Sequence, residues 1–278
     1  MKWIVRFSLL MCTCILLFTI PSVAAAELST HWKVWPTKTE VDIDKEWVIQ
    51  FNDDIEMDWT SLSKGISVVR DRDNKRMRVI PNPIYEDKSK INLFLEELYE
   101  FGETYHLSID NVQSIKGTRL KEPITMKFQT VNPEFNVEKT IERDGIKLHV
   151  MLNAEELSTD EKLYAKLKIT NVSDHAIPHW GLDGCDLGLT ASLFSKSDAG
   201  KVEVGRKWNN RVCTSAIEQY FIEPGETIEV FEVLSPPTNQ LNEKNYLKVV
   251  FRKGLYDNYT DFSPITLMEI PIKIKELK

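Results

Sequence analysis

The alternation of apolar and polar residues with a period of two is the feature that most constrains the fold of this chain. Between Trp32 and Thr130 it recurs in short runs separated by turn residues, which is typical of half-buried β-strands. The apolar faces are Trp47, Ile49 and Phe51; Ile66 and Val68; Ile91, Leu93 and Leu95; Tyr105, Leu107 and Ile109; and Ile124, Met126 and Phe128. We expect about seven strands here, with the polar run 71–75 at a hairpin tip and residues 95–101 as either one helical turn or a loop.

A second set of alternating runs follows Val131-Asn132-Pro133-Glu134, where a proline interrupts the pattern. We expect its strands at 146–152, 163–169, 188–194, 201–204, 227–234, 246–251 and 265–274. The whole chain is longer than a usual single domain, and short alternating strands favour immunoglobulin-like sandwiches. The prediction is therefore all-β, with two immunoglobulin-like β-sandwich domains in tandem, residues 27–131 and 132–278.

Residues 1–26 have the organisation of a cleaved secretory signal peptide. Lys2 and Arg6 make the start positive, residues 9–20 form an apolar run too short to span a bilayer, and Ala24-Ala25-Ala26 offers small residues for cleavage. No later run approaches the roughly 18 apolar residues of a membrane helix, so we expect no transmembrane anchor. The predicted localisation is secreted, with association with the cell wall left open.

The charge of the chain excludes some classes of partner. The formal net charge is −7, and loss of Lys2 and Arg6 with the signal peptide (−7 − 2) makes it −9 in the mature protein. Binding to nucleic acid needs a basic face, whereas the basic residues here are interspersed with acids. Simple attraction to an anionic membrane is disfavoured for the same reason. We therefore expect no nucleic-acid partner.

Two cysteines remain after removal of the signal peptide. Of the four in the chain, Cys12 and Cys14 lie in the apolar run, and Cys185 and Cys213 lie in the second predicted domain. Because export places them in an oxidising compartment, we predict a disulfide between Cys185 and Cys213. Two buried free thiols are the alternative, and a metal site is less favoured because zinc-binding cysteines usually occur in closely spaced pairs.

The first domain carries a family resemblance. Residues 47–57 read Trp-Val-Ile-Gln-Phe-Asn-Asp-Asp-Ile-Glu-Met, and Ile66-Ser-Val-Val follows. Phe-Gly-Glu-Thr-Tyr-His-Leu-Ser-Ile at 101–109, Ile-Lys-Gly-Thr-Arg-Leu-Lys-Glu-Pro at 115–123 and Met-Lys-Phe-Gln-Thr at 126–130 complete the pattern. In order and spacing this resembles the bacterial Ig-like domain of S-layer and other cell-surface proteins, over most of residues 32–130. The resemblance implies a spacer or adhesion module and brings no catalytic residues.

The second domain has a shorter resemblance. Leu-Tyr-Ala-Lys-Leu-Lys-Ile-Thr-Asn-Val-Ser at 163–173 and Ile-Glu-Pro-Gly-Glu-Thr-Ile-Glu-Val at 222–230 are similar to an exported Ig-like scheme. Secreted chaperone-like and proteinase-inhibitor-like β-sandwiches share that scheme. It implies an alternative function, inhibition of an extracellular proteinase by a loop of this domain.

The tryptophans supply the candidate binding residues. If Cys185 and Cys213 are bonded, the loops that carry Trp180 and Trp208 are drawn toward each other. An aromatic floor of these two rings, with His179, Asn209 and Arg211 at its edge, suits a glycan or a peptide chain. The alternative is that both tryptophans pack against the disulfide as core. The remaining tryptophans at 32, 35 and 59 are interpreted as core or edge packing of the first domain.

No coherent catalytic set is present. His175 and His179 have the spacing of zinc ligands on a helix, with Asp183 or Asp186 to complete a site, but Pro178 disfavours a helix there. The segment from 174 to 186 is therefore interpreted as a polar loop, and we predict no enzyme activity, no metal and no cofactor. The leading hypothesis is a non-catalytic protein that binds a cell-wall polymer or an extracellular protein. A metal-dependent hydrolase is the least favoured alternative.

Overall fold

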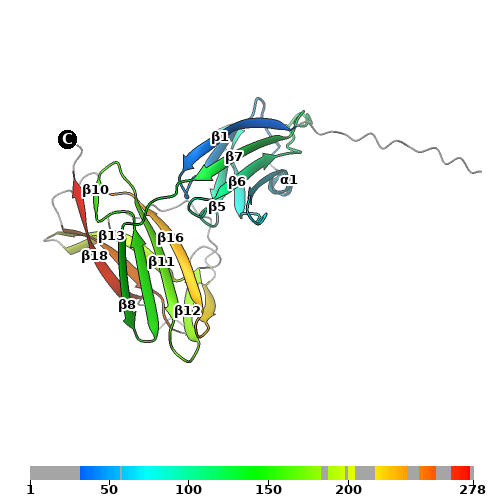
Figure 1. Cartoon of the computed structure of the whole chain (residues 1–278). Coiled ribbons are helices and arrows are strands. Elements are labelled where there is room, and N and C mark those ends of the chain that lie inside the picture. The colour runs from blue at the N-terminus through cyan, green and yellow to red at the C-terminus, as the bar shows by residue number, and fades with distance from the viewer. Residues whose placement is uncertain are drawn as a thin grey trace, which may run out of the picture. The chain divides into compact units, whose positions relative to one another are not determined.

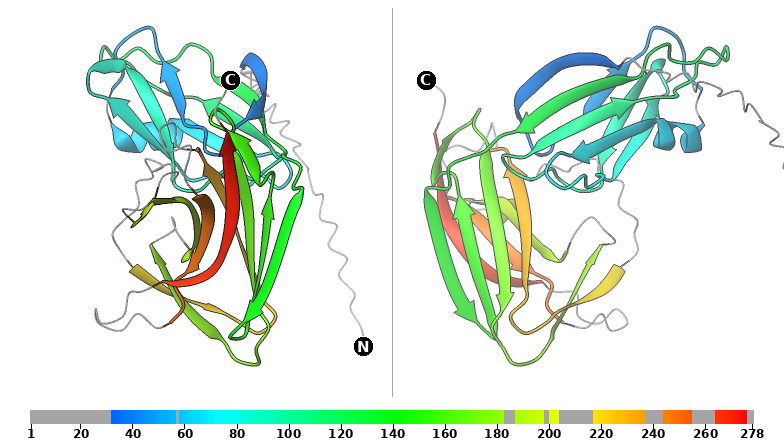
Figure 2. Two further views of the ribbon diagram at one scale, coloured as in Figure 1. Left: turned by 90° about the vertical axis from the view of Figure 1, so that its left-hand side faces the viewer. Right: turned by 45° about the vertical axis from the view of Figure 1, so that its right-hand side comes forward.

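The computed structural model describes residues 32–56, 58–182, 187–197, 200–203, 217–236, 244–254 and 264–275. All of them belong to one compact unit, His31–Lys278 (Figures 1 and 2). In these ranges the chain forms many β-strands and one short helix, so the expectation of a mostly β protein is confirmed. No helix in this part of the chain is long and apolar enough to cross a membrane.

The described residues up to Thr130 form seven strands in two sheets. One sheet has the order β1 (Lys33–Val41), β7 (Ile124–Thr130), β6 (Thr104–Ile109) and β3 (Ile66–Arg70). The other has the order β2 (Trp47–Gln50), β5 (Asp87–Leu95) and β4 (Val79–Ile84). β1 runs parallel to β7, and every other neighbouring pair is antiparallel. The number of strands agrees with the prediction.

Both sheets contribute to the first hydrophobic cluster, and the predicted alternation explains its members. Residues 49, 66, 68, 91, 93, 95, 105, 107, 109, 126 and 128 are all buried in it. Aromatic rings fill its centre: the Phe128 ring centroid lies 5.1 Å from that of Trp47, 5.1 Å from that of Tyr99 and 5.3 Å from that of Tyr105. Aromatic pairs at such separations add to the stability gained from burial alone.

The helix was not predicted, and the helical turn considered at 95–101 is absent. α1 (Trp59–Gly65) begins at Asp58, whose carboxylate accepts hydrogen bonds from the backbone N–H groups of Thr60 and Ser61 at 3.3 and 3.1 Å. Such a cap satisfies N–H groups that have no partner within the helix. α1 buries Leu62 and Gly65 alone, so it has almost no apolar periodicity by which to be recognised.

The polar run 71–75 forms a tight turn, as expected. The Arg70 N–H donates to the Lys75 carbonyl at 2.9 Å, and Asn74 has φ 57°. The turn nevertheless links β3 to β4, which lie in different sheets. β4 occupies the edge of its sheet and contains Pro81 and Pro83.

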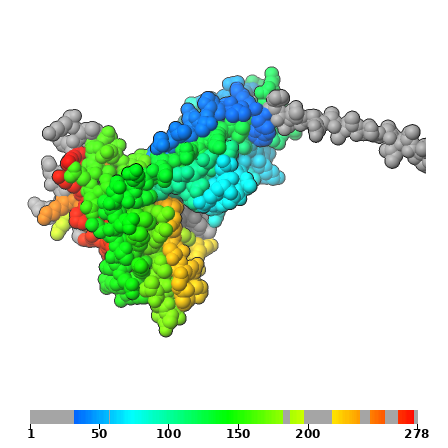
Figure 3. Space-filling view, in the orientation of Figure 1, coloured from blue at the N-terminus to red at the C-terminus, as the bar shows by residue number. Residues whose placement is uncertain are grey.

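The remaining strands form three more sheets. One has the order β16 (Thr227–Leu234), β11 (Leu163–Asn171), β9 (Ile146–Leu152) and β8 (Val137–Arg143). The second has the order β10 (Glu156–Ser158), β18 (Ile265–Lys275), β17 (Lys244–Phe251), β13 (Leu189–Ser197) and β14 (Gly200–Glu203). The third pairs β12 (Ile177–Leu182) with β15 (Ile217–Ile222). In the space-filling view, the strands of the first of these sheets form one continuous surface from green to yellow-orange (Figure 3).

All seven strands expected after residue 131 are present, and four others were missed. β8, β10, β12 and β15 lacked a recognisable signal, for different reasons. β8 is an edge strand with no fully buried residue, β10 is three residues long, and β12 contains Pro178 and Gly181. The β8–β9 hairpin turns at Asp144 (φ 51°) and Gly145 (φ 77°), the positive angles of a type I′ turn.

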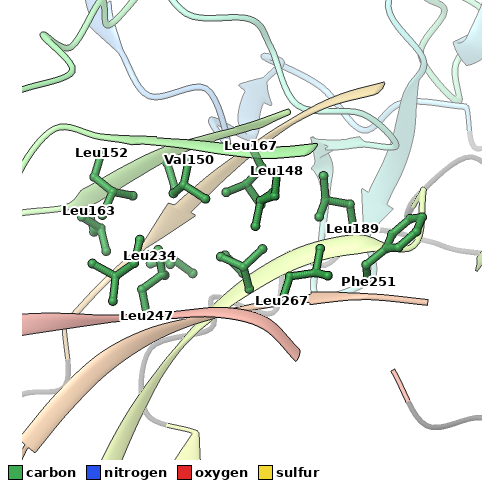
Figure 4. Close-up of a cluster of buried hydrophobic side chains, with 14 of the residues drawn as sticks. Leu148, Val150, Leu152, Leu163, Leu167, Leu189, Leu234, Leu247, Phe251 and Leu267 are labelled. Atoms are coloured by element: carbon green, nitrogen blue, oxygen red, sulfur yellow. The ribbon is translucent and has the colours of Figure 1, made fainter. Parts of the chain in front are cut away.

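The second hydrophobic cluster is aliphatic. Leu148, Val150, Leu152 and Leu167 of β9 and β11 point toward Leu189, Leu247 and Leu267 of β13, β17 and β18 (Figure 4). Phe251 is the single aromatic residue among the buried members of this cluster. The chain therefore has two separate cores within one compact unit, and the domain boundary at 131/132 stays a prediction.

Candidate functional site

The segment interpreted as a polar loop contains a strand, which corrects that expectation. β12 pairs with β15 in the register His179 to Tyr220 and Trp180 to Gln219. On its other edge β12 forms an isolated antiparallel bridge between His179 and Lys253. The Pro178 carbonyl accepts from the Gly254 backbone N–H at 2.8 Å at the end of this short bridge, where a residue without an N–H is tolerated. Trp208, Asn209, Arg211, Cys185 and Cys213 lie outside the described residues. The disulfide and the pairing of the two tryptophan loops therefore stay predictions.

His179 is a core residue. Its side chain is 2% exposed, and its ring centroid lies 5.5 Å from that of Tyr220 and 5.4 Å from that of Phe251. Burial disfavours the charged imidazolium and lowers the pKa of His179, against weaker opposing effects of the Ile177 backbone and Glu226. The imidazole is thus neutral near pH 7 and buried, and a binding role for it together with Trp208, Asn209 and Arg211 stays a prediction.

Trp180 is also packed rather than displayed. It is 9% exposed, and the Arg252 guanidinium carbon lies 4.9 Å from its ring centroid. The backbone N–H of Trp180 donates to the Arg252 carbonyl at 3.1 Å, and the backbone N–H of Arg252 donates to the Gly188 carbonyl at 2.8 Å. A Cβ at Gly188 would lie 2.3 Å from the Trp180 carbonyl oxygen. These contacts favour the core-packing alternative for Trp180.

The two histidines considered as metal ligands lie in different environments. His175 is exposed and its Nδ1 lies 3.0 Å from the Asp174 carboxylate, whereas His179 is buried. Among the residues described, no three or more His, Cys, Asp or Glu side chains are grouped to hold an ion. Asp183 and Asp186 are not in that set, so the absence of a metal stays a prediction.

The Pro224-Gly225-Glu226 segment, which motivated the inhibitor hypothesis, is a closed turn tied to Asn171. The Gly225 N–H donates to the Asn171 carbonyl at 2.9 Å, and the Asn171 N–H donates to the Glu226 carbonyl at 3.0 Å. The buried Asn171 amide donates to the carbonyls of His175 and Ile222, both at 2.8 Å. These bonds give the turn a structural role. Inhibition of an extracellular proteinase by a loop of this domain stays a prediction.

A different surface emerges from the strand directions in the first seven strands. β2, β4 and β6 end, and β1, β3, β5 and β7 begin, at the same end of their two sheets. This end, which we call the loop end, comprises residues 51–56, 58–65, 85–86 and 110–123 with the start of β1. Figure 1 shows α1 and the start of β1 together there.

Hydrogen bonds hold the loop end together. The Ile55 N–H donates to the Lys88 carbonyl at 3.1 Å, and the Ile115 N–H donates to the Asp54 carbonyl at 3.0 Å. The Lys33 N–H donates to the Pro123 carbonyl at 2.8 Å. Lys116 Nζ lies 3.0 Å from both carboxylate oxygens of Asp53, and this hydrogen bond lowers the pKa of Asp53. Connections distant in sequence thus form one continuous surface.

Large apolar side chains are exposed on this surface. Trp32 is 41%, Trp59 47%, Tyr85 87% and Ile115 59% exposed. Trp32 and Trp59 are therefore not core residues, and edge packing is the remaining part of that prediction, while Trp35 is half-buried against the first core. Exposed Trp and Tyr side chains grouped on loops are typical of recognition surfaces. Sequence reasoning missed these residues because the sheet order is what places their connections at the same end of the two sheets.

The comparisons with known proteins identify no family. No protein-family model matches the chain, and no curated protein matches it in sequence. Among solved structures, one similarity is to the N-terminal part of the bacterial S-layer protein SbsC, with 9% sequence identity and a TM-score of 0.28. It covers 85% of this chain and 42% of that one, so the chain spans less than half of that structure. A likeness at this score carries no inference about function.

Proposed function

We propose that the chain is a secreted, non-catalytic protein of two immunoglobulin-like β-sandwiches that binds a cell-surface polymer through the loop end. The division of the first seven strands supports this interpretation. The third, sixth and seventh strands share one sheet, and the second, fourth and fifth share the other, as in immunoglobulin folds. In such folds, loops gathered at one end of the sandwich commonly carry recognition.

The exposure of Trp32, Trp59 and Tyr85 on converging connections is the observation that carries the proposal. These side chains leave apolar area in contact with water, although its burial would be favourable. Exposed apolar area of this kind is typical of interaction surfaces. Acidic and basic side chains are interspersed at the loop end, and Asp53 pairs with Lys116 there. A surface with aromatic rings and charges of both signs suits a largely uncharged polymer better than a highly charged one.

Co-sedimentation of the mature protein with insoluble cell-wall material from its own organism tests this function. A variant with Trp32→Ala, Trp59→Ala and Tyr85→Ala should lose binding at least tenfold. Phe221→Ala is the matched control, because Phe221 is 52% exposed on β15, far in sequence from the loop end. Equal binding of the triple variant and the wild type would refute the site. If the wild type did not bind the wall material and captured a secreted protein instead, the proposal that the ligand is a polymer would be refuted.

A further inference from the structure

The two hydrophobic cores are connected by contacts between residues more than a hundred positions apart. Val233 of β16 is buried in the first cluster, and Tyr164 and Phe231 of the second set of strands pack against that same cluster. A member of the second set of strands is thus enclosed by side chains of the first. We call this group of contacts the joint.

Phe101 is the aromatic centre of the joint. Its ring meets those of Phe135, Tyr164 and Phe231 at centroid distances of 5.6, 5.6 and 5.2 Å. The interplanar angles of 69°, 85° and 86° are those of edge-to-face pairs, the favourable geometry for aromatic rings. Each ring comes from a different segment, so the contacts depend on both cores being folded.

The segment before Phe135 is itself held by backbone bonds. The Val131 N–H donates to the Val41 carbonyl and the Gly102 N–H donates to the Val131 carbonyl, both at 2.9 Å. Gly102 has φ 70°, and a Cβ there would lie 3.0 Å from the Asn132 side chain. The connection therefore lies along the first core instead of hanging free between the two.

Asp42 supplies the polar part of the joint. One of its carboxylate oxygens accepts a hydrogen bond from the Tyr164 hydroxyl at 2.8 Å, and the other pairs with Lys162 Nζ. Lys162 Nζ also lies 3.8 Å from the nearly buried carboxylate of Asp44. Burial, with the Asp42 carboxylate next, raises the pKa of Tyr164, so its hydroxyl remains a donor at neutral pH.

We infer that the joint makes the two cores one cooperative body, with Phe101 as its apolar centre and Asp42 as its polar anchor. Short connections with few contacts allow domains to move independently, whereas a buried, aromatic and hydrogen-bonded interface opposes motion. Unfolding either core exposes the joint residues of the other. In this inference the first seven strands, which carry the loop end, do not move independently of the second set of strands.

Calorimetry and small-angle scattering on the mature chain test the inference. The wild type should unfold in one calorimetric transition, and Phe101→Ala should separate it into two and enlarge the radius of gyration of the native protein. Phe221→Ala, which truncates an exposed aromatic side chain outside the joint, should change neither. Two well-separated transitions in the wild type, or a Phe101→Ala variant that behaves as Phe221→Ala does, would overturn the inference.

A double-mutant cycle guards against the case in which Phe101→Ala simply unfolds the first core. Asp42→Asn and Tyr164→Phe remove the polar anchor with little change in volume. Because both act on one contact, their combined effect on the unfolding equilibrium constant should differ from the product of the single effects by at least about fivefold. Tyr85→Phe, which changes an exposed hydroxyl, should combine multiplicatively with Asp42→Asn. Multiplicative behaviour of Asp42→Asn with Tyr164→Phe would contradict the joint.

Discussion

The two cores of this protein are filled in different ways. The first is organised around the rings of Trp47, Tyr99, Tyr105 and Phe128, and the second is filled by Leu, Ile, Val and Ala with Phe251 at its margin. Aliphatic contacts are non-directional, so many arrangements of similar volume satisfy them. A buried tyrosine with a bonded hydroxyl imposes geometry, and the Tyr105 hydroxyl accepts from the Glu100 backbone N–H at 2.8 Å. The first core therefore determines the positions of its loops more strictly than the second.

Substitution by another apolar residue should distinguish the cores most strongly. Phe128→Leu removes one ring from three aromatic pairs, each worth about 0.5–1.5 kcal/mol, so we expect a loss of about 2–4 kcal/mol in the free energy of unfolding. Leu167→Met in the fully buried centre of the second core should cost less than about 1.5 kcal/mol. Urea denaturation measures both. Equal losses would remove the proposed contrast.

The next largest effect is expected where the second core meets the β12–β15 sheet. Gly188→Ala combines a φ of 79° with a Cβ 2.3 Å from the Trp180 carbonyl oxygen, so the free energy of unfolding should fall by about 2–3 kcal/mol. Gly225 has the same φ of 79° but nothing within 4 Å of its Cβ. Gly225→Ala should therefore cost about 1 kcal/mol, the conformational part alone. If thermal melts give the two variants the same loss, the close approach at Gly188 has no energetic consequence.

A smaller effect tests the directional bonds of the first core. Tyr105→Phe removes the hydroxyl that accepts from the Glu100 N–H at 2.8 Å, and we expect a loss of about 1 kcal/mol. Tyr85→Phe is the control, since that side chain is exposed and should change stability by less than about 0.5 kcal/mol. Chemical denaturation compares them. A Tyr105→Phe variant as stable as the wild type would show that the hydroxyl does not position the 100–103 turn.

The smallest effect is the pH dependence due to His179. Burial lowers the pKa of His179 in the folded protein below its usual value near 6.5, so the unfolded chain binds the proton first. The stability contribution is complete above about pH 6.5 and is lost as the pH falls below that value. His179→Phe should flatten the dependence of the melting temperature between pH 7.5 and 5.0. An unaltered pH profile in this variant would be inconsistent with a buried neutral imidazole.

The strands with one buried face could be predicted from the sequence, because alternation reports that geometry directly. β9 and β16 have the predicted bounds, 146–152 and 227–234. β8 could not be found because Val137 and Ile141, its two apolar residues, are separated by charged and polar residues and are only partly buried against the second core. β12 was concealed by Pro178, which normally argues against a strand but is allowed at an edge.

The candidate site was harder to predict than the fold. Trp180 and His179 were predicted as binding residues from their residue types, and the structure shows both side chains packed and largely buried. Trp59 and Tyr85 lie outside every alternating run, and strand direction and sheet order place their connections at the same end of the two sheets. Neither property is contained in local sequence. Residue type alone thus identifies side chains capable of binding, while exposure and convergence decide which ones are available.

The two prolines of β4 have a consequence for the protein in concentrated solution. Being two residues apart, Pro81 and Pro83 direct their nitrogen atoms to the same side of the strand, and neither nitrogen carries a hydrogen. A strand from a second molecule that paired with this edge of β4 would find no backbone N–H donor at Pro81 or Pro83. It would therefore gain few hydrogen bonds there. β4 thereby disfavours growth of its sheet into fibres.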